Sequence, residues 1–128
     1  MKAWPDNPFL QGYYEPITFE ATAPDLVVEG EMPKDLNGTF YRNGPNPQFP
    51  PENEFHFFTG DGMVHAFTFD GGRVSHMNRW ARTQRFEIEK RLGGSYFSGL
   101  NPLETDPRLL EFVLNDKQGV ANTNVIWH

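Results

Sequence analysis

The chain has 128 residues, a formal net charge of −6 and no cysteine, and 15% of its residues are aromatic. This length predicts one small domain, and an acidic chain without a run of Lys or Arg excludes a nucleic-acid-binding surface. The lack of cysteine excludes a disulfide framework and a thiolate metal site, and residues 1–11 lack the apolar segment of a signal peptide, so we expect a cytoplasmic location.

The first 36 residues are expected to form an N-terminal arm followed by a leading strand. Residues 1–16 contain three prolines and little periodicity, which indicates an extended arm, with Tyr13, Tyr14 and Ile17 as its anchors. The β-branched run at residues 26–30 ends at a glycine and predicts a strand.

Short strands separated by turns are expected next. Residues 39–42 form a strand that Asn43-Gly44-Pro45 stops, because proline has no amide donor for the ladder. A proline-rich loop follows, then a strand at residues 55–58 and a turn at 59–62.

The clearest local signal is a hairpin. Residues 63–69 and 73–81 flank Asp70-Gly71-Gly72, a turn sequence typical of tight β-hairpins. Alternation predicts two largely covered faces, one of them carrying Met63, His65, Phe67 and Phe69.

The last third of the chain gives weaker patterns. Residues 86–92 do not form one apolar helical stripe and are interpreted as a short extension or single turn. Asp106 is expected to cap a short helix at 107–112, and residues 119–127 to form the last strand. Short strands of this kind predict an all-β fold and favour a propeller blade over a small barrel.

Four motifs resemble the N-terminal signature of the carotenoid cleavage oxygenase family. They are RNGPNP at residues 42–47, GDGMVHA at 60–66, NRWART at 78–83 and ANTNV at 121–125. Each motif is weak alone, but four in this order and spacing make chance agreement unlikely. Members of this family are non-haem iron enzymes that split conjugated carbon–carbon double bonds with dioxygen.

The resemblance implies a seven-bladed β-propeller. Residues 1–36 would be the arm and leading strand, and residues 37–128 an incomplete propeller domain with the first blade and part of the next. It also implies Fe(II) as cofactor of the complete enzyme, bound by four histidines downstream of the segment that resembles residues 121–128. No residue of this chain is therefore expected to bind the metal, and the chain is interpreted as an N-terminal fragment that is inactive alone.

The implied reaction is cleavage of a carotenoid or apocarotenoid to two carbonyl products, with O₂ and an apolar polyene as partners. A stilbene, as cleaved by the lignostilbene dioxygenases, is the alternative substrate. Peripheral contact with a membrane is implied by lipid-soluble substrates. A different class of function stays open, namely a non-catalytic β-domain or truncated product that binds an apolar ligand through its aromatic residues.

The four histidines are candidate metal ligands. His65 and His76 lie on the two arms of the hairpin and could share a metal, but two imidazoles without a matching carboxylate favour packing. His56 lies among phenylalanines and is predicted to be a partly buried structural residue. His128 corresponds to a family position that is not an iron ligand.

Two charged residues in the motifs have structural interpretations. Asp61, between two glycines, is predicted to bond its own backbone in a turn rather than to act as a catalytic carboxylate. Arg42 could bind an anion, but the interpretation preferred for it is a buried arginine that joins neighbouring blades through its planar donors.

Two residues are candidates for the site through the resemblance. Thr123 resembles the threonine that points toward the iron in many family members and limits which small ligands approach. Tyr96 resembles, with a few intervening residues, the tyrosine that binds the substrate phenol in the stilbene-cleaving branch. This offset favours a carotenoid substrate over a stilbene.

Overall fold

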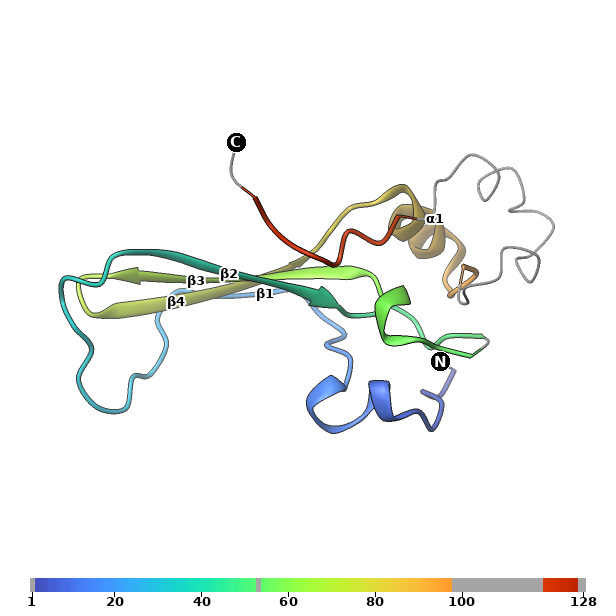
Figure 1. The fold of residues 1–128 in the computed structure, drawn as a ribbon, viewed down its shortest axis with the longest axis horizontal. Helices are drawn as coiled ribbons and strands as arrows, with labels where there is room; N and C mark the ends of the chain where they lie inside the picture. Colours follow the sequence, from blue (N-terminus) through green and yellow to red (C-terminus); the bar gives the residue numbers. More distant parts are fainter. Residues whose placement is uncertain (1, 53, 98–118, 127–128) are drawn as a thin grey trace.

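One antiparallel sheet forms the centre of the computed structural model, which describes residues 2–52, 54–97 and 119–126 (Figure 1). The strand order is β1-β4-β3-β2, with β1 at Ala21–Ala23, β2 at Gly38–Pro45, β3 at Gly62–Asp70 and β4 at Arg73–Trp80. The described helices are three short 3₁₀ turns, η1 at Pro8–Leu10, η2 at Gly12–Tyr14 and η3 at Phe57–Thr59, and one α-helix, α1 at Gln84–Leu92. The predicted all-β class is confirmed.

The β3–β4 hairpin follows the prediction closely. Its register runs from Met63 opposite Trp80 to Asp70 opposite Arg73. The two residues of the turn, Gly71 and Gly72, have φ of +56° and +90°. A type I′ hairpin turn requires positive φ at both positions, so the two glycines determine where the chain reverses.

Strand β2 continues where the sequence predicted a stop. It includes the predicted turn residues 43–45 and ends at Pro45, which lies opposite Gly62 of β3. Proline is tolerated there because β2 is an outer strand with a single neighbour, so its missing amide costs no ladder bond on the open side.

Two strands predicted in the first half of the chain are wrong. The first strand, β1, lies before the predicted run at 26–30 and pairs with β4. In the predicted run, the amide of Leu26 donates to Val74 O at 2.8 Å. Residues 55–58 do not form a strand but lead into η3, because His56 Nδ1 accepts the Phe58 amide and caps this turn.

The last third also differs from the prediction. Residues 86–92 belong to α1, which begins after the N-cap Thr83 and ends at Gly93 in the left-handed conformation. Residues 119–126 form no strand, although the amide of Gly62 bonds to Val120 O at 2.7 Å. The predicted cap at Asp106 and helix at 107–112 lie outside the described residues.

Packing is concentrated at one end of the sheet, where α1 and the C-terminal segment lie (Figure 1). Met63 and Phe86 are almost completely buried there. On the predicted faces of residues 63–69 only Thr68 is exposed, whereas Phe40, Tyr41 and Met77 of the neighbouring strands are 58%, 53% and 41% exposed.

The N-terminal arm is held differently from the prediction. Leu10 is its buried residue, whereas Tyr13 is fully exposed and Tyr14 half exposed, so neither tyrosine is the anchor that was expected. Ile17 is anchored, because Asn46 bonds both its amide and its carbonyl. The predicted boundary at residue 36 stays a prediction. No helix among the described residues is long and apolar enough to cross a membrane.

Candidate functional site

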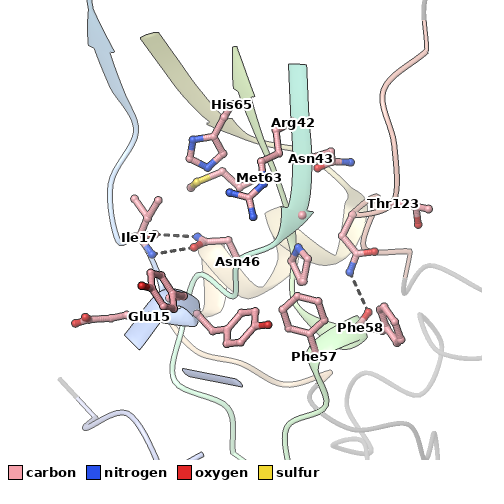
Figure 2. A pocket seen from close by; sticks show the side chains of 15 residues that line it. Glu15, Ile17, Arg42, Asn43, Asn46, Phe57, Phe58, Met63, His65 and Thr123 are labelled. Carbon is pink, nitrogen blue, oxygen red and sulfur yellow. Dashed lines mark hydrogen bonds between the residues drawn. The ribbon is translucent and has the colours of Figure 1, made fainter. Parts of the chain in front are cut away.

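A cavity of about 340 Å³ opens at the packed end of the sheet (Figure 2). Its walls come from five segments, which are the arm at residues 13–17, the end of β2 and the following loop at 42–46, η3 at 57–58, the start of β3, and residues 122–123. Segments far apart in sequence therefore meet around one space, which is the usual setting of a ligand site.

One wall of the cavity is aromatic. The ring centroids of Tyr14 and Phe57 are 5.2 Å apart in an edge-to-face arrangement, and those of Phe57 and Phe58 are 5.8 Å apart. Met63 adds an apolar thioether to the lining. Such a surface favours a flat, apolar ligand, because edge and face contacts between rings add to the burial of apolar area.

Asn46 connects the arm to the sheet below this wall. Its Oδ1 accepts the Ile17 amide and its Nδ2 donates to Ile17 O, both at 2.8 Å. The backbone amide of Asn46 donates to Asp61 O at 2.6 Å, and its backbone carbonyl accepts the Trp80 Nε1–H at 2.9 Å. Sequence reasoning placed Asn46 in a motif but missed this role, although a buried asparagine must satisfy both ends of its amide.

The C-terminal segment is clamped onto the same end of the sheet. Asn43 Nδ2 donates to Ala121 O at 3.0 Å, and Asn122 Nδ2 donates to the carbonyls of Phe58 and Gly60 at 2.9 and 2.8 Å. These bonds bring Thr123, the residue predicted at the site, to the edge of the cavity, where it is exposed (Figure 2). Its role toward a metal stays a prediction.

Tyr96, the second predicted site residue, lies elsewhere. It is half-buried beyond α1, where it packs against Ile88 and Phe97, and its amide donates to Glu89 Oε1 at 2.7 Å. It is not among the residues that line the cavity with Thr123. The structure therefore does not bring the two predicted residues together, and substrate binding by Tyr96 stays a prediction.

Two histidines of the hairpin approach each other as predicted. His65 Nδ1 lies 3.1 Å from His76 Nε2, and the rings stack with centroids 5.3 Å apart. Burial, followed by the charges of His76 and Arg42, lowers the pKa of His65, so this ring is neutral at neutral pH.

Iron was tested against the donors that the chain provides. Within the described ranges, no three His, Asp or Glu side chains converge on a point that could hold a metal ion. The His65–His76 pair offers two nitrogens already engaged with each other, so these residues do not fit an iron site. His56 is exposed rather than partly buried as predicted, and His128 lies outside the described residues.

A buried ionic cluster joins α1 to the turn before β3. Arg85 Nε lies 3.7 Å from Asp61 Oδ1 and 3.5 Å from Glu89 Oε2, and both carboxylates are buried. Burial raises the pKa of Asp61 to about 6, against the opposing charge of Arg85 and with a further increase from Glu89. Asp61 is thus not only the local turn residue that was predicted, because it also contacts a helix that the sequence interpretation missed.

Arg42 is exposed, which corrects its predicted burial. It lies on the outer strand β2, and its guanidinium points into the cavity beside Met63 and His65 (Figure 2). The predicted contact between blades has no counterpart among the described residues.

Comparison with known proteins identifies the family. The family of the retinal pigment epithelial membrane protein matches residues 14–128. The chain is also 35% identical over 134 residues to the carotenoid 9,10(9′,10′)-cleavage dioxygenase 1 of Pisum sativum, covering 94% of this chain and 25% of that relative. The chain belongs to the carotenoid cleavage oxygenase family. The predicted membership is confirmed.

Two further members of the carotenoid cleavage oxygenase family match this chain over its whole length. The chain is 40% identical over 130 residues to the lignostilbene-alpha,beta-dioxygenase isozyme III of Sphingomonas paucimobilis, covering 100% of this chain and 26% of that enzyme. The crystal structure of the Pseudomonas brassicacearum lignostilbene dioxygenase matches with a TM-score of 0.79 and 32% identity, over 100% of this chain and 26% of that one. The chain thus spans about a quarter of the length of its relatives.

These solved relatives are β-propellers, and the sheet of this chain corresponds to the N-terminal part of that fold. The prediction of propeller structure is confirmed.

Proposed function

We propose that the chain is the N-terminal part of an oxygenase that uses dioxygen to cleave a conjugated carbon–carbon double bond into two carbonyl products. The observation that carries this proposal is the match to the lignostilbene dioxygenases over the whole chain, in sequence and in backbone. The cavity supports it, since it offers an aromatic wall for a flat apolar substrate.

The cofactor proposed for the complete enzyme is Fe(II). Its ligands would lie outside the described residues, because these provide no convergent set of donors. This chain would then contribute part of the wall that positions the substrate and excludes water. Thr123 is proposed as the residue of this wall nearest the reaction, which its place at the edge of the cavity supports.

An aryl-substituted alkene is proposed as the substrate class, ahead of the carotenoid that the position of Tyr96 favours. The support is that two lignostilbene dioxygenases match 100% of this chain, against 94% for the carotenoid-cleaving relative. Phenol binding by Tyr96 is retained as part of the stilbene alternative and rests on the family resemblance alone. We also propose that the complete enzyme is cytoplasmic and makes peripheral contact with membranes. Fractionation of cells that express the complete enzyme tests this location.

A chimera tests the proposed function. Residues 1–128 would replace the aligned quarter of the Sphingomonas paucimobilis enzyme, and the product would be incubated with 4-hydroxystilbene or an apocarotenal under ¹⁸O₂. We expect two carbonyl products by mass spectrometry, and no stoichiometric iron in the 128-residue chain alone.

Iron content distinguishes a failure of assembly from a failure of the proposal. A chimera that folds and holds iron like its parent but cleaves neither substrate contradicts the proposed function and favours a non-catalytic domain. A parent enzyme lacking its first quarter is the matched control, and it should be inactive.

A further inference from the structure

Arg42 brings an uncompensated positive charge into the cavity. Three other arginines have carboxylate partners, with Arg73 on Asp25, Arg82 on Glu20 and Arg85 on its two buried acids. Among the described residues no carboxylate forms an ion pair with Arg42, and no side chain accepts a hydrogen bond from its guanidinium. Within the described part of the chain, the five donors of this group therefore remain available to a ligand.

The charge is not neutralised by the other titratable residues of the lining. Glu15 belongs to the same lining, but its carboxylate points away from the cavity and from Arg42 (Figure 2). His65 is on the same side as Arg42, and its pKa is lowered, so it adds a polar ring without adding a second charge. The centre of the cavity is thus positive and next to an aromatic wall.

This combination of groups has a defined complement. A guanidinium presents a planar fork that matches the two oxygens of a carboxylate, and such charge-assisted pairs are about twice as strong as neutral hydrogen bonds. The rings of Tyr14, Phe57 and Phe58 favour an aromatic body. A ligand with both features satisfies the arginine and covers the rings at once.

We propose that the cavity binds an aryl alkene that carries a carboxylate, with the carboxylate on Arg42 and the aromatic body against the Tyr14–Phe57–Phe58 wall. As a statement about substrate this rests on the proposed function, but the binding itself does not. Arg42 is then a residue that determines specificity for an acidic over a neutral alkene.

The test compares two probes that differ in one group. The 128-residue chain, labelled with ¹⁵N, is titrated with trans-stilbene-4-carboxylate and with the neutral trans-stilbene-4-methanol, and the side-chain signals of Arg42 and Asn46 are followed by NMR. We expect the carboxylate to bind about tenfold more tightly. Arg42→Gln should abolish this preference, and Arg42→Lys, which retains the charge but not the fork, should keep only part of it.

A matched control removes the same charge elsewhere. Arg73 lies at the far end of the hairpin, outside the cavity. The variant Arg73→Gln should therefore leave the preference for the carboxylate probe unchanged. Backbone signals of β3 and β4 show whether each variant retains the fold. Equal affinity for the two probes, or a preference that survives in folded Arg42→Gln, overturns the inference.

The two proposals can fail separately. Cleavage of neutral stilbenes by the chimera without any carboxylate preference in the chain sustains the proposed function and refutes the role of Arg42. A carboxylate preference that depends on Arg42, together with an iron-loaded but inactive chimera, sustains the role of Arg42 and refutes the proposed function.

Discussion

Replacing Gly62 by alanine should detach the C-terminal segment from the sheet. A Cβ at this position would overlap the carbonyl oxygen of Ala121 and lie 2.6 Å from its carbonyl carbon and 2.9 Å from Val120 O. These are backbone atoms, so no side-chain rotation can relieve the overlap. The segment must move away, and it then loses the bonds from the Gly62 amide to Val120 O and from Asn43 Nδ2 to Ala121 O.

The expected cost follows from these contacts. These two hydrogen bonds, with a net value of about 0.5–1.5 kcal/mol each, give roughly 1–3 kcal/mol as the lower bound, because Asn122 and a second bond of Asn43 also hold the segment. Amide hydrogen exchange measures it locally, and we expect the Gly62→Ala position to lose protection by about tenfold or more. Urea unfolding measures the change in the global free energy of unfolding.

Gly44→Ala is the matched control. Gly44 lies on the neighbouring strand β2 opposite Met63, and a Cβ there meets no atom within 4 Å. This variant should stay within about 0.5 kcal/mol of the original chain. If both variants unfold alike and exchange around residue 120 is unchanged in Gly62→Ala, the close approach does not hold the segment and the reasoning is wrong.

Three further predictions concern the ionic cluster and the predicted site. Because the folded-state pKa of Asp61, about 6, exceeds its ordinary 3.8, the folded chain binds more protons between these values. The free energy of unfolding should therefore fall by up to about 3 kcal/mol as pH rises from 4 to 6, and Asp61→Asn should flatten this dependence in urea titrations. Glu89→Ala should cost about 3–5 kcal/mol in thermal unfolding, because it leaves buried Arg85 with Asp61 alone and removes the acceptor of two amides. Exposed Glu87→Ala should cost less than about 0.5 kcal/mol. Thr123→Ala should change the melting temperature less than Thr59→Ala, which loses a buried bond, yet lower turnover of the chimera; unchanged turnover would make Thr123 a residue without a role at the site.

The hairpin could be predicted because its signals are local. Gly71 and Gly72 adopt the positive φ that the turn requires, and the flanking alternation belongs to the strands themselves. The run at 26–30 has the same β-branched composition, yet Val27 is 94% exposed and no strand forms. Composition alone does not make a strand where no face is buried.

Helix α1 could not be found from hydrophobic periodicity, and the structure shows why. Its buried face carries Arg85 and Glu89 beside Phe86 and Ile88, so half of that face is charged. Periodicity detects a helix only when its buried side is apolar. The cap Thr83 and the glycines after Leu92 were the signals in the sequence that could have located its ends.

The site depends on contacts that no local pattern records. Asn122 reaches Gly60 across 62 positions, and Asn43 reaches Ala121 across 78. Membership of the family could be predicted, because the motifs stand in the correct order, whereas the role of Thr123 stays a prediction. The burial of Arg42 and of His56 was predicted wrongly, since both depend on which segments cover them.

Asparagines of the sequence motifs connect the N-terminal arm to the sheet. Asn46 bonds both the amide and the carbonyl of Ile17, and Asn78 accepts the Ala21 amide while donating to Phe19 O, all at 2.8 Å. A side-chain amide has the same donor and acceptor as a peptide group. Each asparagine can therefore bond the backbone groups of the arm that no neighbouring strand pairs. Aspartate would lack the donor at these positions and leucine would lack both groups. The motif asparagines therefore determine how the arm and the C-terminal segment contact the sheet. Three of them, Asn43, Asn46 and Asn122, also line the cavity.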